Sequence, residues 1–180
     1  MKRILILSLI LGVGLKLNAQ KHMTQNGVIS FFSSTPVENI EAINNQVSAV
    51  INSENGEIAA VLLVKAFNFE KALMQEHFNE KYVESDKYPK SVFKGRVIDF
   101  DKLELNGAME PVNLKGELTI HGITNSIIAE GTISKENTSL NLNVEFNVNV
   151  ADYEIKIPKT VRDNIAEEIM VTVRFKLDEV

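Results

Sequence analysis

The amino-acid sequence predicts an all-β fold, a closed antiparallel barrel with one helix. The clearest sign is residues 140–150, LNLNVEFNVNV, in which apolar residues alternate with Asn and Glu. Side chains of a strand point to opposite faces in turn, so this segment is one long strand with a dry and a wet face. Comparable segments recur about eight or nine times. A single sheet of that size buries its dry face and removes its edges by closing into a barrel. A β-sandwich is the alternative.

The first third of the chain predicts short strands after a polar stretch, residues 20–27. The strand expected at residues 58–67 is apolar on both faces, so both of its faces need cover, and the helix that follows is expected to cover the outer one. Before it, the expected elements are a strand at 28–33, a brief helical or extended segment at 40–43, a strand at 47–52 and a hairpin turn at 53–56.

Residues 70–82 carry the one convincing helical pattern. Asn68 is the expected N-cap, and Glu70 suits the positive end of the helix dipole. Four residues share one arc of the helix and form its apolar side, namely Leu73, Met74, His77 and Phe78. Pro89 disfavours helical conformation in the residue before it and therefore ends this region.

The rest of the chain returns to β structure. A final strand at 169–177 is preceded by a polar connection, 159–168, with room for two helical turns. The other strands expected are residues 91–100 with a continuation at 102–105, residues 112–121, residues 126–134, and the long strand 140–150, whose alternation extends through Tyr153, Ile155 and Ile157 to Pro158.

Residues 1–19 have the pattern of an export signal. Lys2 and Arg3 precede an apolar run at 4–15, and Ala19 is a small residue at the expected cleavage point. The run is shorter than the roughly 20 residues of a transmembrane helix, so an uncleaved anchor is the weaker alternative. The sequence therefore predicts a periplasmic or secreted protein whose single domain spans residues 20–180.

Composition limits the classes of partner. The full chain has a formal net charge of -5, and without residues 1–19 it keeps 16 basic and 24 acidic residues, a net charge of -8. Such a charge repels phosphate backbones and anionic membrane surfaces, so nucleic acid is not expected as a partner, nor is stable membrane insertion. The chain has no Cys, which excludes disulfides and thiolate metal sites.

Two blocks of sequence resemble a known family. Residues 73–82 (LMQEHFNEKY) lead into 85–95 (SDKYPKSVFKG), and residues 116–124 (GELTIHGIT) stand further on, before Asp152-Tyr153. This order is similar to that of the YceI-like family, extracytoplasmic bacterial proteins described as polyisoprenoid-binding. The resemblance covers residues 31–177. It implies an extended, lipocalin-like, eight-stranded antiparallel barrel whose apolar interior holds a long isoprenoid chain such as a quinone tail.

An eight-stranded barrel either fills with side chains or holds one slim ligand. If it holds a ligand, the aromatic and long apolar residues on dry faces line the cavity. These candidate ligand-binding residues are Phe67, Met74, Phe78, Phe93, Leu118, Ile120, Val144, Phe146, Val173 and Phe175. Each of them is also an ordinary core residue, so the hypothesis depends on the set.

Polar residues give weaker signals. His77 lies near Glu76 and Glu80, but its place on the apolar side of the helix favours a packed histidine over a metal ligand. His121 reads as a solvated residue or a loop anchor, and His22 falls in the polar stretch. Glu117 and Glu145 pair as acid and base only if strand register brings them together. No motif for a nucleophile, phosphate loop or zinc helix is present, so neither a catalytic nor a metal site is predicted.

The sequence thus predicts a non-catalytic binding or carrier protein for a long apolar isoprenoid lipid, with no cofactor. Two alternatives remain. One is an enzyme acting on a small lipid or sugar at the barrel mouth, and the other is a ligand-free structural or stress protein with a filled barrel. A homodimer is also open at this point.

Overall fold

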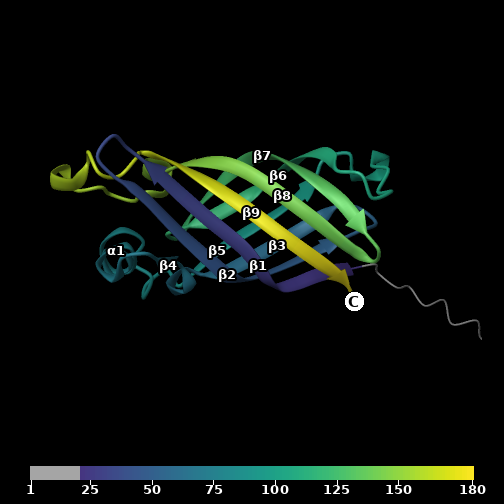
Figure 1. Ribbon diagram of the computed structural model, residues 1–180, viewed down its shortest axis with the longest axis horizontal. Coiled ribbons are helices and arrows are strands. Elements are labelled where there is room, and N and C mark those ends of the chain that lie inside the picture. The colour runs from purple at the N-terminus through teal and green to yellow at the C-terminus, as the bar shows by residue number, and fades with distance from the viewer. Residues whose placement is uncertain (1–20) are drawn as a thin grey trace, which may run out of the picture.

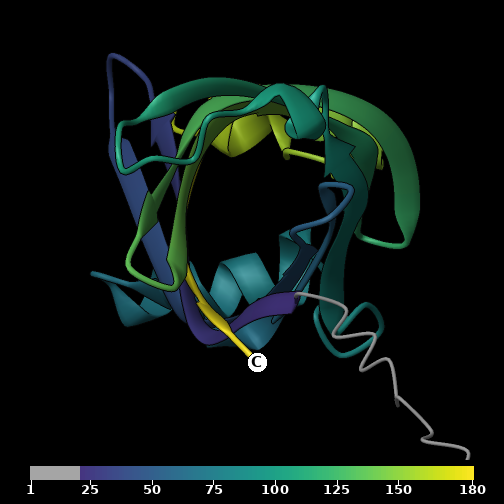
Figure 2. The ribbon, with the colours of Figure 1, turned by 90° about the vertical axis from the view of Figure 1, so that its right-hand side faces the viewer.

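The computed structural model describes residues 21–180, so the predicted export signal lies outside the described residues. Eight strands close into an antiparallel barrel in the order β1-β9-β8-β7-β6-β5-β3-β2, and β2 then pairs with β1 (Figures 1 and 2). The two-residue β4 is attached to β2. The strands are β1 (Lys21–Ser34), β2 (Asn39–Asn52), β3 (Glu57–Leu63), β4 (Asn68–Phe69), β5 (Lys90–Val97), β6 (Glu110–Ile120), β7 (Ile123–Glu136), β8 (Ser139–Asn149) and β9 (Glu168–Glu179).

The alternation that predicted a barrel is confirmed on β8. Leu140, Leu142 and Val144 are buried inside the barrel, whereas Asn143 and Glu145 are exposed outside it. Because all eight strands belong to one closed sheet, the β-sandwich alternative is wrong. The barrel follows from one dry face on every long strand, which closure buries without leaving an edge.

One end of the barrel is packed solid. Four strands meet there through apolar side chains that are at most 1% exposed, namely Ile51 of β2, Ile133 of β7, Leu140 and Leu142 of β8, and Leu177 of β9. Phe100 closes this end from a 3-10 turn, Phe100–Lys102. Gly56, at φ +72°, leaves room for the Phe100 side chain, since a Cβ at position 56 would lie only 2.6 Å from the Phe100 Cβ. The ligand-sized space must therefore lie at the other end.

The N-terminal strand is longer than the sequence indicates. β1 begins at Lys21, so the polar stretch from residue 21 onward is part of the barrel wall and not a free stub. Its pairing register shifts between Thr24 and Gly27 and again between Gly27 and Ile29. The first part of β1 therefore lacks the regular two-residue alternation by which a strand is recognised in a sequence. His22 is buried, and neither ring nitrogen has a hydrogen-bond partner among residues 21–180. β2 is likewise one continuous strand over the segment where a brief helix was considered.

The helical segment differs most from expectation. The α-helix α1 covers only Ala72–His77 and continues as a π-helical turn, Phe78–Tyr82. Its N-cap is Lys71, and Asn68 belongs to β4 instead. The segment does not cover the outer face of β3. It lies across the open end of the barrel, since the apolar side of the helix packs against the hollow interior there (Figure 1).

Three other connections correct the sequence reading. β5 ends at Val97, and residues 98–105 form a loop with a 3-10 turn, not a strand continuation. β8 ends at Asn149, because a 3-10 turn at Val150–Tyr153 and a left-handed Glu154 turn the chain away. The connection to β9 contains one short 3-10 turn, Lys159–Val161, where two helical turns were allowed.

Candidate ligand cavity and its mouth

Three hollows follow one another along the barrel axis, starting at the end covered by α1. Their volumes are about 260 Å³ at the mouth, 160 Å³ in the middle and 70 Å³ at the inner position. The mouth and middle hollows share Phe31 and Phe78, and the middle and inner hollows share Leu118 and Phe146. The hollows therefore adjoin one another, and we refer to the three together as the blind cavity, which ends against the packed half of the barrel.

The inner hollow exists because small residues occupy the wall. Phe93 lies over the inward sides of Gly95 and Gly116, which face each other on β5 and β6. A Cβ at either glycine would come within 2.7 Å of Phe93 Cζ. The two glycines thus let the ring lie against the wall instead of filling the centre. The lining of this hollow is apolar throughout.

The middle hollow is lined almost entirely by apolar side chains, which come from five strands (β1, β3, β6, β8 and β9) and from turns and links near the mouth. Interior residues such as Ile29, Phe146 and Val171 remain partly exposed although they point into the barrel. In a close-packed core such residues have no accessible surface, so their exposure reports unfilled space. The one polar side chain from a strand is Ser91, whose Oγ donates a hydrogen bond of 2.8 Å to the Thr119 carbonyl and is thereby satisfied.

Four phenylalanines separate the mouth from the middle hollow. Phe31 comes from β1, Phe69 from β4, Phe78 from the π-helical turn, and Phe67 from the link between β3 and β4. Their ring centroids are 5.0–5.8 Å apart in five contacting pairs, within the range of favourable aromatic packing. The cluster joins three separate chain segments at the narrow point of the cavity, so the entry route passes beside these rings.

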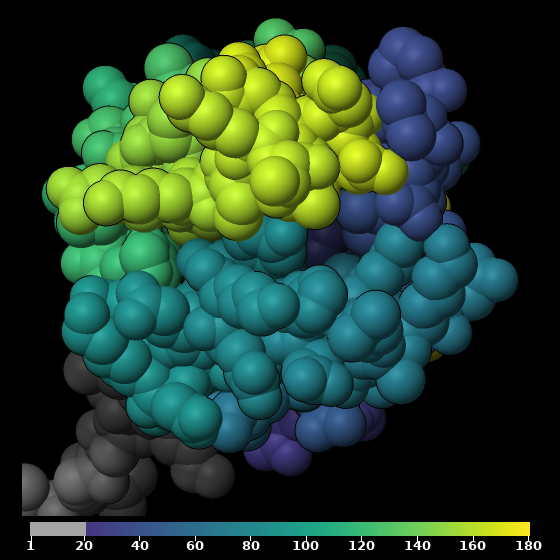
Figure 3. Space-filling view, turned by 90° about the vertical axis from the view of Figure 1, so that its left-hand side faces the viewer, coloured from purple at the N-terminus to yellow at the C-terminus, as the bar shows by residue number. Residues whose placement is uncertain are grey.

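Three segments surround the mouth itself. They are the β1–β2 turn, the helical segment with Met74 and Tyr82, and the connection between β8 and β9 with Ile155 and Ile165. Figure 3 shows this end, with the helical segment in teal facing the yellow-green connection across a furrow. Burial raises the pKa of Tyr82, so the phenol at the mouth stays neutral at physiological pH. The mouth is apolar with a few polar groups on its rim.

One set of polar contacts ties this rim together. Lys71 Nζ donates to Glu38 Oε1 at 2.9 Å, and Asn164 Nδ2 donates to the other oxygen of Glu38 at 3.4 Å. The hydrogen bond from Lys71 holds the pKa of Glu38 below its usual value. The backbone N–H of Ala166 donates to the buried Ser33 Oγ at 2.9 Å. These bonds hold the β1–β2 turn, the helical segment and the β8–β9 connection around one opening.

His121 makes a second set of contacts. It occupies the β6–β7 turn at φ +52°, with Nε2 2.8 Å from Glu84 Oε2 and Nδ1 3.0 Å from the Tyr153 carbonyl oxygen. Both partner atoms are acceptors, so the two bonds form together only when both ring nitrogens carry a proton. The hydrogen bond with His121 lowers the pKa of Glu84. His121 is thus a loop anchor and not a solvated strand residue.

All ten residues expected from the sequence to line a cavity border one of the three hollows. Met74 and Phe78 lie at the mouth, and the others are in the wall of the middle or inner hollow: Phe67, Phe93, Leu118, Ile120, Val144, Phe146, Val173 and Phe175. The sequence reading missed Ile29 and Phe31 on β1 and Val171 on β9. The alternation of β9 places Val171 inward, which was the available signal, whereas residues 28–32 are apolar on both faces, which conceals the inward direction of Ile29 and Phe31.

The polar residues considered for other chemistry stay apart. Glu117 and Glu145 lie on outer faces of β6 and β8, with β7 between them, so they do not form an acid–base pair. His77 borders the mouth hollow. Within residues 21–180 no group of three His, Cys, Asp or Glu side chains is arranged to hold a metal ion. No helix in the same range is long and apolar enough to cross a membrane.

The fold and the blind apolar cavity define the chain as a closed eight-stranded antiparallel β-barrel with one helix and a hollow apolar end. Its sequence matches the model of the YceI-like domain over residues 18–177, and the chain therefore belongs to the YceI-like family. No curated protein sequence matches it significantly.

Solved structures share this fold at low sequence identity. A polyisoprenoid binding domain from Saccharophagus degradans, implicated in plant cell wall breakdown, has a TM-score of 0.77 and 16% identity, covering 90% of this chain and 99% of that one. BcnA of Burkholderia cenocepacia has a TM-score of 0.70 and 12% identity over 84% and 95%. A YceI protein from Campylobacter jejuni has a TM-score of 0.53 and 13% identity over 100% and 99%. The lipocalin-like barrel implied by the resemblance is confirmed.

Proposed function

We propose that this protein binds one long, slim, apolar lipid of the isoprenoid class in the barrel interior and carries it without changing it chemically. The observation that carries the proposal is the blind cavity, which is apolar from the four-phenylalanine cluster to the packed end. Membership of the YceI-like family supports it, as does the similarity to a structure described as a polyisoprenoid binding domain.

Burial of hydrocarbon supplies the affinity. Each methylene removed from water contributes about 0.8 kcal/mol, so a few prenyl units offset the cost of ordering the chain. We expect the tail to pass the phenylalanine cluster and to contact the ten cavity residues predicted from the sequence, together with Ile29, Phe31 and Val171. A small polar head would remain at the mouth, near Tyr82, His77 and Asn164.

The proposal also covers the domain organisation, the location and the chemistry of the protein. The mature protein would be a single domain, residues 20–180, in the periplasm or outside the cell, with no cofactor and no catalytic residue. The two alternatives are less well supported. A ligand-free structural barrel needs a filled interior, and the three hollows oppose it. An enzyme needs a pair of reactive groups aimed into the cavity, and the carboxylates of the rim are hydrogen-bonded to other parts of the rim.

The proposal predicts a dependence of affinity on prenyl chain length. In titrations of prenyl alcohols of increasing length, each added five-carbon unit should lower Kd more than tenfold until the cavity is full, because up to five more carbons leave water. Beyond that length Kd should level off, since further units remain outside. Straight-chain alcohols of matched carbon number are the control that distinguishes a preference for isoprenoid lipids from general binding of hydrocarbon chains. Kd values independent of length, or the absence of binding at every length, would contradict the proposal.

A further inference from the structure

The outer wall of β2 and β3 exposes apolar side chains. Val50, Val61 and Leu63 are 36%, 37% and 51% exposed. Ala59 and Val92 adjoin them, because Ala59 pairs with Val50 and Val61 pairs with Val92 in the sheet. The sequence reading expected the helix to cover this face, but the helix lies at the mouth. A contiguous apolar strip in solvent marks an interaction surface.

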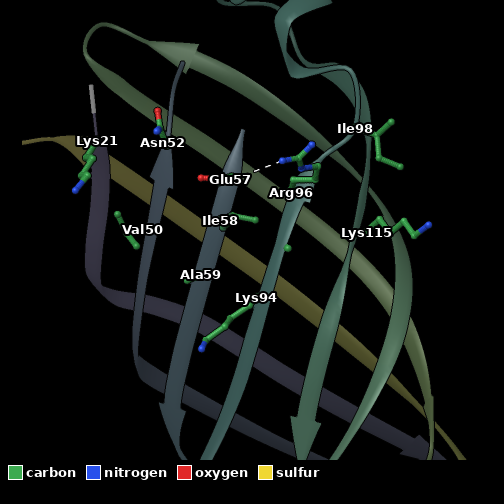
Figure 4. A pocket seen from close by; sticks show the side chains of 11 residues that line it. Lys21, Val50, Asn52, Glu57, Ile58, Ala59, Lys94, Arg96, Ile98 and Lys115 are labelled. Carbon is green, nitrogen blue, oxygen red and sulfur yellow. Dashed lines mark ion pairs between the residues drawn. The ribbon is translucent and has the colours of Figure 1, made fainter. Parts of the chain in front are cut away.

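Basic side chains flank this strip. A shallow groove of about 670 Å³ on the same wall is lined by Val50, Ala59 and Ile98 together with the cations Lys21, Lys94, Arg96 and Lys115 (Figure 4). Further along β5, Lys90 stands opposite Leu63.

Few acids balance these cations. Glu57 pairs with Arg96 at 3.6 Å, and Glu117 is the ladder neighbour of Lys94. Lys21, Lys90, Lys94 and Lys115 form no ion pair with any residue in the described range 21–180. The wall is therefore cationic, and we call this surface, from Lys21 and Lys115 to Leu63 and Lys90, the basic wall.

The sign of this charge is opposite to that of the protein as a whole. Without residues 1–19 the chain carries 24 acidic and 16 basic residues. A molecule with an acidic net charge approaches an anionic surface only in an orientation that presents its cations. The repulsion expected from net charge alone therefore does not apply to this wall, and the wall fixes one orientation.

We propose that the basic wall docks the barrel onto a bilayer containing anionic phospholipid. Lys90, Lys94 and Lys115 would meet the phosphates, while Val61 and Leu63 would enter the interface, the combination by which peripheral proteins bind such membranes. The wall also reaches the mouth, since Leu63 leads into the 3-10 turn Val64–Ala66 and Val64 lines the middle hollow. The relevance of this geometry to lipid loading rests on the proposed function; the docking itself does not.

Vesicle flotation tests the inference. The wild-type protein should float with vesicles of phosphatidylcholine and phosphatidylglycerol but not with phosphatidylcholine alone, and added salt should weaken binding. The double variant Lys94→Glu/Lys115→Glu should lower the partition coefficient about tenfold or more, because each cation near an anionic surface contributes substantially to the free energy of binding. The matched control is Lys135→Glu/Lys176→Glu, which makes the same change in net charge at exposed positions on β7 and β9. It should bind within about twofold of wild type. Leu63→Ser should weaken binding without altering the salt dependence.

Two results would overturn the docking inference. One is the absence of wild-type binding to the anionic vesicles, which would leave an acidic protein as the partner of the wall, and the other is an equal loss in both double variants. Prenyl-alcohol titration of the same proteins keeps the two proposals apart. Lipid affinity without vesicle binding refutes only the docking, and vesicle binding without lipid affinity refutes only the proposed function. Circular dichroism confirms that each variant is folded.

Discussion

Leu142→Asp unfolds the barrel. Leu142 is fully buried on β8, where it pairs with Ile133 of β7 and Phe175 of β9 in the sheet. A carboxylate at this position has no cationic partner and borders only the small apolar inner hollow, away from bulk water, so we expect a loss of at least about 4 kcal/mol in the free energy of unfolding. Chemical denaturation followed by circular dichroism measures it.

Two further variants test whether the loss depends on the side of β8 that the residue faces. Asn143→Asp, one residue along and exposed outside the barrel, should change stability by less than about 0.5 kcal/mol. Phe146→Asp, on the same inner face, should cause a loss of stability between those of the other two variants, because the middle hollow beside Phe146 admits water to the carboxylate. Equal losses from Leu142→Asp and Asn143→Asp would show that the facing of β8 is wrong.

Val171→Trp blocks lipid binding while the barrel stays folded. Val171 borders the middle hollow and lies beside Phe31 and Phe146 on the neighbouring strands. An indole there occupies the space of about one prenyl unit, and losing that burial should raise Kd roughly 100-fold. The ring enters an existing hollow, so the destabilisation should be smaller than the 1–3 kcal/mol that is usual for overpacking a filled core.

The neighbouring Met170 provides the matched control for this variant. Its side chain is exposed on the outer face of β9, so Met170→Trp adds the same indole outside the cavity and should leave Kd unchanged. Isothermal titration with a prenyl alcohol compares the two. A Val171→Trp protein that binds as tightly as wild type would exclude the middle hollow as the lipid site, and one that simply unfolds would show that the hollow is not available space.

Local alternation explains why much of the wall could be predicted from sequence. Whether Val144 or Phe175 faces inward depends only on its parity along a regular strand, and the sequence displays that parity directly. β1 shows the limit of this rule. Its register shifts by one residue between Thr24 and Gly27, and residues 28–32 (VISFF) are apolar on both faces, so spacing alone does not show that Ile29 and Phe31 point inward.

The mouth depends on contacts between distant segments, and such contacts leave little local signal. Glu38 and Asn164, which bond across the opening, are 126 residues apart, and Glu84 and His121 are 37 apart. The short α1 and its π-helical turn are shaped by packing on the cavity end, which overrides the helix propensity that indicated a longer helix. The position of the helix over the mouth, and not over β3, has the same cause.

Whether the barrel is hollow also could not be read from strand patterns, because both a packed and an open barrel have apolar inner faces. The difference lies in the summed volume of side chains at each level. Gly95 and Gly116 reduce that volume beside the inner hollow, whereas Ile51, Ile133 and Leu177 fill the opposite end. Inward glycines are therefore the sequence signal that best indicates the hollow part.

The central claim is that the barrel interior carries an isoprenoid chain. Native mass spectrometry of the protein purified from its own host, followed by organic extraction and mass analysis of the released material, tests it most directly. The account predicts a species heavier than the mature chain by the mass of one lipid, with prenyl-unit spacing in the fragments of the extract, and loss of that species in Val171→Trp but not in Met170→Trp. A wild-type protein that carries no lipid, or only straight-chain fatty acids, would contradict it.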